Sequence, residues 1–102
     1  MSVNGKVSVS VESKHQERVE KFLTKRKSDV QEIADSISRA EYPSIKMMGE
    51  LIKKSAGNFG MEDLKNLGQA IETAANIKDS GKLKELAVEL GAYLESLEVK
   101  YV

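Results

Sequence analysis

From Ser13 onward, apolar residues recur every three or four positions, and this helical spacing is broken in three places. The breaks lie at Pro43, at Gly57–Gly60 and at Asp79–Gly81. Proline cannot continue a helix, and glycine and short polar side chains favour turns. The pattern therefore divides the chain into helical segments joined by short connections, which leaves little room for a sheet-based fold.

The spacing predicts helices over residues 13–40, 43–56, 61–78 and 82–100. A polar stretch, Thr24–Asp29, interrupts the first of them and predicts a kink or a break there, which would create a short extra helix at the start. Connections of a few residues force consecutive helices to be antiparallel neighbours. The fold class we predict is all-α, an antiparallel up-and-down four-helix bundle.

The first residues follow a different pattern. Val7, Val9 and Val11 alternate with polar residues, and this period of two with β-branched side chains is typical of extended chain. Because no second strand-like run is evident, we expect residues 1–12 to form an extended or flexible arm. The bundle itself is expected to comprise residues 13–102.

Composition excludes several classes of function. The chain has no Cys and a single His, so thiol chemistry and paired-His metal sites are ruled out, and we expect no metal and no cofactor. Its 16 Lys and Arg balance its 16 Asp and Glu, which argues against a nucleic-acid partner. No apolar run approaches the roughly 20 residues that span a bilayer. We expect a cytoplasmic, monomeric protein without membrane contact and, lacking a catalytic constellation, not an enzyme.

The most distinctive stretch is Gly49–Gly60, which reads GELIKKSAGNFG. It resembles the central motif of histidine-containing phosphotransfer (HPt) domains of bacterial phosphorelays, which lies on the second helix of their bundle. Other segments are similar to that family's first, third and last helices: Phe22–Val30, Leu67–Ala75, Leu90–Leu97 and Val99–Tyr101. The resemblance implies a four-helix bundle and, as partners, a response-regulator receiver domain, a histidine kinase or both.

Two positions depart from the family's motif. Glu50 stands where the family has its phosphate-accepting histidine, and Lys54 stands where it has a glycine that leaves room for the receiver. The only histidine, His15, lies in the first predicted helix, where we expect it to be exposed. Phosphoryl relay requires a nucleophilic nitrogen, which Glu50 lacks. Its single negative charge only partly imitates a phosphoryl group of about −1.5 to −2.

These observations predict a divergent HPt-like module that binds a receiver without carrying phosphate. The residues we assign to this surface share the outer face of the second helix: Met47, Glu50, Leu51, Lys53, Lys54 and Gly57. Three alternatives stay open. Glu50 could be an ordinary surface residue paired with Lys54 one turn later. The chain could relay phosphate through His15, or it could be a structural bundle that self-associates through Met47 and Leu51.

Overall fold

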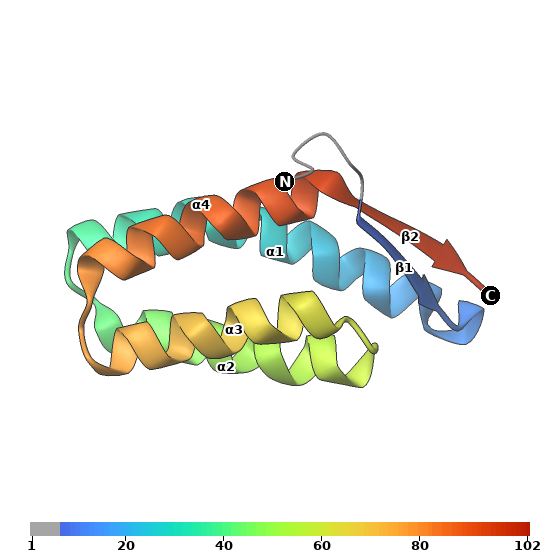
Figure 1. Ribbon diagram of the computed structural model, residues 1–102, viewed down its shortest axis with the longest axis horizontal. Helices are drawn as coiled ribbons and strands as arrows, with labels where there is room; N and C mark the ends of the chain where they lie inside the picture. The colour runs from blue at the N-terminus through green and yellow to red at the C-terminus, as the bar shows by residue number, and fades with distance from the viewer. Residues whose placement is uncertain (1–6) are drawn as a thin grey trace.

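The computed structural model describes residues 7–102, in which four α-helices are accompanied by a single 3₁₀ turn and two short strands (Figure 1). The helices are α1 (Gln16–Ser38), α2 (Tyr42–Asn58), α3 (Glu62–Asn76) and α4 (Ser80–Ser96). The strands are β1 (Val7–Val11) and β2 (Leu97–Tyr101). The predicted helical fold is therefore confirmed at the level of class, with a small sheet added to it.

The two strands correct two predictions. β1 is not a lone arm, because it pairs in parallel with β2, with Val7 opposite Leu97 and Val11 opposite Tyr101. The last helix ends at Ser96 and not near Lys100. Leu97 continues the helical spacing of the leucines before it, but from there on apolar and charged residues alternate, and this alternation suits a strand. Residues 1–6 of the predicted arm lie outside the described part of the chain.

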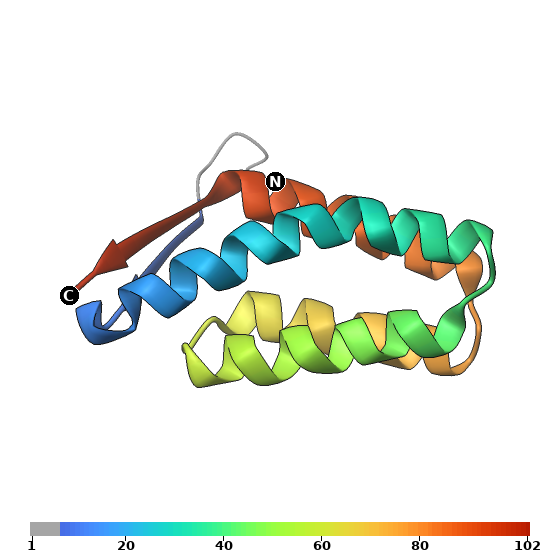
Figure 2. The same cartoon turned by 180° about the vertical axis from the view of Figure 1, so that it is seen from behind.

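Helix α1 runs without a break through the polar stretch at Thr24–Asp29, so the break that the sequence allowed there is wrong (Figure 2). Arg26 and Asp29 are buried there, with side chains only 4% and 3% exposed, and their Nε and Oδ2 atoms lie 2.8 Å apart. The Nε–H is not aligned for a hydrogen bond, so the contact is electrostatic. Lys25 Nζ reaches the other carboxylate oxygen of Asp29 at 3.0 Å. A buried ion pair thus occupies inward-facing positions of α1 where the run of apolar residues is interrupted.

The short extra helix that such a break would have created is therefore not formed, and a single 3₁₀ turn, Ser13–His15, lies directly before α1 instead. It connects the sheet to the bundle.

The three helix–helix connections share one backbone design. Ala40, Gly60 and Lys78 each adopt a positive φ just after a helix ends. The residue that follows each of them donates its N–H to a carbonyl five positions back, from Glu41 to Ser36, Met61 to Ala56 and Asp79 to Ala74. This is the Schellman arrangement, which closes a helix in one turn. The same residue is also the N-cap of the next helix, so each reversal takes very few residues.

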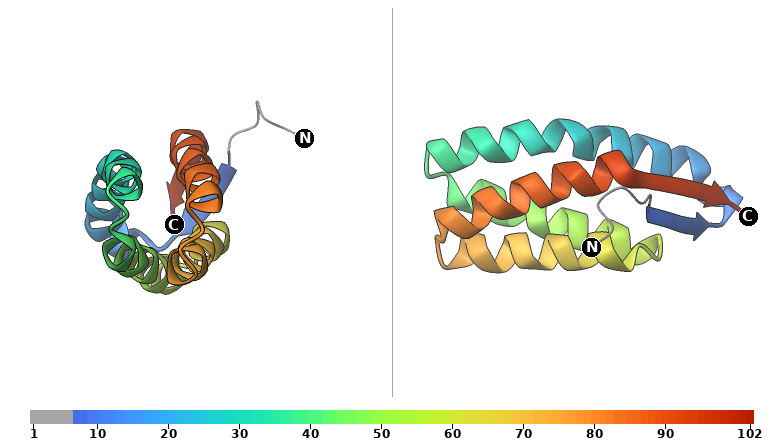
Figure 3. Two further views of the ribbon diagram at one scale, coloured as in Figure 1. Left: turned by 90° about the vertical axis from the view of Figure 1, so that its left-hand side faces the viewer. Right: turned by 45° about the horizontal axis from the view of Figure 1, so that its top comes forward.

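Helices α2 and α3 meet backbone to backbone at Gly49 and Gly68. A Cβ built on Gly49 would lie 2.7 Å from the Glu72 nitrogen, and one built on Gly68 would lie 2.6 Å from the Lys53 nitrogen. Real Cβ atoms do not approach backbone so closely, which means that only glycine fits at this crossing. Helices α2 and α3 therefore form one closely packed layer. Helices α1 and α4 both lie against one side of this layer (Figure 3).

The core lies between the layers and is almost entirely aliphatic. Its fully buried large side chains come from all four helices and from the α2–α3 connection: Val19, Ile33, Ile45, Ile52, Met61, Leu64, Ile71, Leu83 and Leu90. Val11 of β1 joins them, and Val9, Val99 and Tyr101 pack against the core from the sheet. Within residues 7–102, no helix combines the length and the apolar character needed to cross a lipid bilayer.

Candidate functional site

The orientation of α2 follows from its buried stripe. Ile45, Gly49, Ile52 and Ala56 face inward, and this turns Glu50 to solvent. At about 100° per residue, Gly57 and Lys54 lie within about 40° of Glu50 around the helix axis. Among the residues that the structure describes, no side chain forms an ion pair or hydrogen bond with Glu50. The pair with Lys54 that would mark it as an ordinary surface residue is therefore not formed.

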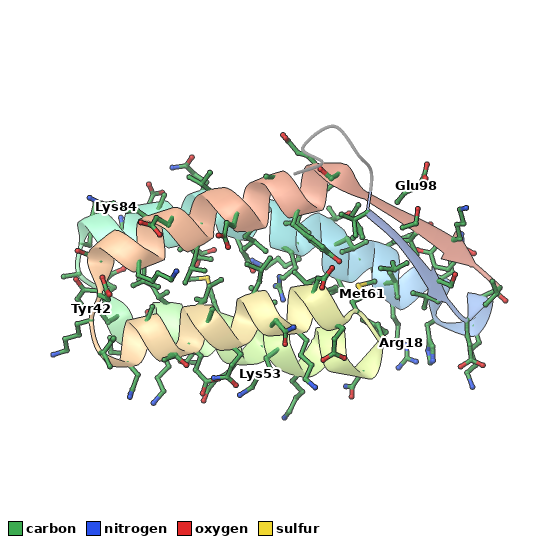
Figure 4. The ribbon with its side chains drawn as sticks, in the orientation of Figure 1. Arg18, Tyr42, Lys53, Met61, Lys84 and Glu98 are labelled. Carbon is green, nitrogen blue, oxygen red and sulfur yellow. The ribbon has the colours of Figure 1, made fainter. Side chains whose placement is uncertain are left out.

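Lys53 occupies one flank of this face, beside α3. Its Nζ lies 2.7 Å from Oε1 of Glu72 and 3.0 Å from Oε1 of Gln69, so two α3 side chains hold it in place. Figure 4 shows Lys53 on the side of the α2–α3 pair that faces away from α1 and α4. The Lys53 backbone nitrogen is also the atom that approaches Gly68. The glycine contact and the ion pair thus fix this flank together.

Met47 and Leu51 occupy the opposite flank, toward α1. They are 67% and 48% exposed, which is unusual for large apolar side chains. They line a shallow hollow of about 380 Å³, whose other walls are Ser44 and Met48 of α2 and Glu32 of α1. The candidate face therefore has an ordered cation on one flank, a free carboxylate at its centre and an apolar hollow on the other flank.

Lys54 and Gly57 complete the face toward the end of α2. Both are exposed, and a Cβ on Gly57 would meet only the Cδ of Lys65 at 3.6 Å, an ordinary van der Waals distance. Gly57 is thus not required by packing.

His15 lies elsewhere and in different surroundings from those expected. It is partly buried, with its ring centroid 6.0 Å from that of Phe59, and Phe59 in turn packs edge-on against Phe22 at 5.7 Å. Nη2 of Arg18 lies 2.6 Å from its Nδ1. The predicted exposed surface histidine is therefore only partly exposed. Phe59 comes nine positions after Glu50, about 13 Å along the helix axis, so His15 is remote from Glu50 at the centre of the candidate face.

Tyr93 on α4 is the one side chain near α3 whose titration is clearly altered. Its hydroxyl is buried without a hydrogen-bond partner among the described residues. Burial raises the pKa of this phenol above its ordinary value, and the nearby negative charge of Asp63 adds to the effect. The group belongs to the bundle interior and not to the candidate face.

Across residues 7–102, no three His, Asp or Glu side chains gather closely enough to hold a metal ion.

A second hollow, which the sequence analysis did not predict, lies between α1 and α4. It measures about 580 Å³, and its apolar walls come from Val30, Ala34, Ala87 and Val88, with Lys84 at its edge. Val88 is 73% exposed and lies outside the apolar stripe of α4, a signal that was available from the helical spacing. None of its lining residues belongs to the candidate face on α2.

A scan against protein-family models, a search of curated proteins and a search of solved structures each found no match to this chain. The interpretation of the α2 face therefore depends on its own residues. The face presents no histidine at its centre, but a negative charge between a cation and an apolar hollow, and this arrangement suits binding.

Proposed function

We propose that this chain is an HPt-like interaction module that binds a response-regulator receiver domain through the outer face of α2 without carrying phosphate. The observation that carries the proposal is the unpaired carboxylate of Glu50, at the motif position of the phosphate-accepting histidine, between Lys53 and the Met47–Leu51 hollow. The module would sequester or tether its partner, or compete with a phosphorylated domain for it.

The chemistry of the face supports binding over transfer. A phosphoryl group moved onto Glu50 would form an acyl phosphate, which is more labile to hydrolysis than the phosphohistidine of the resembled family. As a fixed charge, Glu50 presents only −1 where phosphohistidine presents about −1.5 to −2, so the imitation is partial. Exposed Met47 and Leu51 supply the apolar contact area that such a small charged site lacks.

The proposal includes an antiparallel, up-and-down arrangement of the four helices. The α1–α2 and α3–α4 connections lie at one end of the bundle and the α2–α3 connection at the other, which supports it (Figure 1). The tight Schellman closures favour the same arrangement, because short connections make neighbouring helices antiparallel. A receiver as partner also implies a cytoplasmic location, where such domains act.

Two other functions have less support. Phosphate relay through His15 would need an accessible ring nitrogen. Nδ1 faces Arg18 at 2.6 Å and the ring packs near Phe59, so Nε2, 3.9 Å from Oε1 of Glu12, is the nitrogen left for such a role. A structural bundle joined through Met47 and Leu51 would use the same hollow as the receiver. The effect of a mutation in that hollow therefore has to be measured both on receiver binding and on self-association.

The test is a binding titration against receiver domains of the same organism, with and without a phosphate analogue. Met47→Ala should weaken binding, and Ile77→Ala is its matched control, because Ile77 is 66% exposed but lies after α3, outside the candidate face. Glu50→Arg should abolish the electrostatic part of the affinity and its dependence on salt. The proposal fails if no receiver binds in either state, or if Met47→Ala and Ile77→Ala behave alike.

A second experiment restores the family's motif with Glu50→His and Lys54→Gly together. If the face has kept the shape of a phosphotransfer site, this variant should accept an acid-labile phosphoryl group from a phosphorylated receiver, whereas Glu50→Gln with Lys54→Gly should not. Labelling of both variants, or loss of label on mutation of His15, would instead favour relay through another acceptor.

A further inference from the structure

The sheet is unusual because it consists of two parallel strands only. Parallel sheets normally have many strands and are covered on both faces, and two-stranded sheets are marginal in water. One face of this sheet packs on the core through Val9, Val11 and Val99. Within the described residues, no helix packs along the edge of β1 that faces away from β2 (Figure 3).

The hydrogen bonds define which backbone groups point to that free edge. Val102 N–H donates to the Val11 carbonyl, and Ser13 N–H donates to the Val102 carbonyl. Backbone groups alternate in direction along a strand, so the valines of β1 aim theirs at β2. Ser8 and Ser10 aim theirs away, and among the described residues neither has a backbone partner on that side.

The sequence of β1 is a palindrome, VSVSV. An antiparallel copy of the strand centred on Val9 therefore places Val opposite Val and Ser opposite Ser. In this register Ser8 and Ser10 form hydrogen-bonded pairs with Ser10 and Ser8 of the second copy, which uses all of the free N–H and C=O groups. The valines of both copies then share one apolar face.

The edge also lacks the features that proteins use to prevent such pairing. Charged side chains, especially Lys, and Pro commonly block edge strands. Residues Val7–Val11 carry neither, whereas β2 presents the exposed Glu98 and Lys100. Figure 4 shows Glu98 projecting outward from β2.

We propose that β1 is a self-association edge, through which two copies of the chain join into a four-stranded sheet about a two-fold axis at Val9. The strand order is β2–β1–β1–β2, parallel within each copy and antiparallel between them. This departs from the monomer expected from the sequence. A contact of this length buries little area, so the dimer is weak and depends on concentration. The proposal is independent of the receiver surface on α2.

Disulfide trapping tests the register, because the natural chain has no cysteine. Val9→Cys would place two Cα atoms about 4.5 Å apart across a non-hydrogen-bonded pair, within the range of about 4.4–6.8 Å for disulfides. With oxidised glutathione, we expect this variant to form covalent dimers about tenfold faster than Val99→Cys, its matched control on the neighbouring strand. Equal rates, or faster dimerisation of Val99→Cys, would overturn the proposal.

Charge exchange tests the edge without a covalent bond. A chain with Ser8→Lys and Ser10→Lys should sediment as a monomer up to millimolar concentration, and so should one with Ser8→Glu and Ser10→Glu. Mixed, the two should form a heterodimer, because each Lys then lies opposite a Glu. Circular dichroism checks that both chains remain helical. Folded chains that do not associate when mixed, together with a wild type that is monomeric throughout, would rule out this interface.

Discussion

The α2–α3 contact and the α1–α4 contact hold the bundle together in opposite ways. At the first, Gly49 and Gly68 bring two backbones together so closely that no side chain fits between them. At the second, a Cβ on Gly91 would meet only Val30 Cγ1 at 3.5 Å, and a hollow of about 580 Å³ lies alongside. The difference shows that the candidate face lies on the more closely packed half of the molecule, while α1 in the other half contains a buried ion pair between two of its own residues.

The largest effect is expected from removing one member of that pair. Asp29→Ala leaves the buried Arg26 without its main counter-charge, and we expect a loss of about 3–5 kcal/mol in unfolding free energy. Asp35→Ala is the control on an exposed position of α1 and should change little. Urea denaturation of both variants measures the difference, and similar small losses would mean that α1 does not depend on the pair.

Alanine at the glycines compares the two contacts directly. Gly68→Ala forces the α2 and α3 backbones apart and should cost about 3 kcal/mol, as overpacking of a close contact does. Gly91→Ala meets only a side-chain methyl group and should be neutral, or stabilising by up to about 1 kcal/mol through better helix propensity. Thermal melts of the two variants give the comparison. Equal melting temperatures would remove the distinction between the contacts.

Tyr93 links the stability of the α3–α4 side to pH. Its pKa is raised in the folded state, so the folded protein holds the phenolic proton more tightly than the unfolded chain. This stabilisation is complete below the ordinary pKa of a tyrosine and is lost as the pH rises through the higher folded value. Tyr93→Phe should therefore lose less stability in alkali than the wild type, while remaining within about 1 kcal/mol of it at pH 7.

Tyr101 acts in the same direction as Tyr93, because burial and the charge of Glu20 raise its pKa as well. Replacing both tyrosines with Phe should flatten the alkaline profile further than Tyr93→Phe alone. Denaturant midpoints measured from neutral to strongly alkaline pH test both variants, and an unchanged slope for Tyr93→Phe would contradict the assignment.

The smallest effect is expected at the candidate site itself. Glu50→Ala removes an exposed, unpaired carboxylate, so unfolding free energy should stay within about 0.5 kcal/mol of the wild type. The same change should weaken receiver binding. Because this measurement separates stability from binding, a large loss of stability would show that Glu50 supports the fold instead of a partner.

Much of the helical fold could be predicted because its signals are local, within a few residues of each helix end and along each helix. Pro43 and the turn residues at Gly57–Gly60 and Asp79–Gly81 locate the connections approximately, although Gly57 still belongs to α2 and Ser80 and Gly81 to α4. The apolar spacing correctly placed Gly49 on the inner face. The close approach of Gly49 to Gly68 could not be predicted, because it depends on how two distant helices meet. The burial of the Arg26–Asp29 pair could not be predicted either, because two charged residues at this spacing on an exposed helix form an ordinary surface pair.

The sequence also contains a signal for the second strand, but the helical spacing before it favoured a longer helix. Leu97 extends the spacing of Leu90 and Leu94, and this favoured helix, although Val99 and Tyr101 alternate with charged residues. Only the presence of β1 decides between the two patterns. For the candidate face, the sequence indicated which residues of α2 point outward, but not that Lys53 is held by Glu72 or that Met47 and Leu51 line a hollow with α1.

The pairing of β1 with β2 also has a consequence for folding kinetics. It joins residues from opposite ends of the described chain, so the loop it closes contains all four helices. Closing so long a loop is unfavourable until the helices have already brought its ends together. The sheet should therefore form after the bundle, and its amides should open as a unit and exchange with solvent sooner than those of α2 and α3. A β1 strand released in this way is free to find another copy of itself before it finds its own β2.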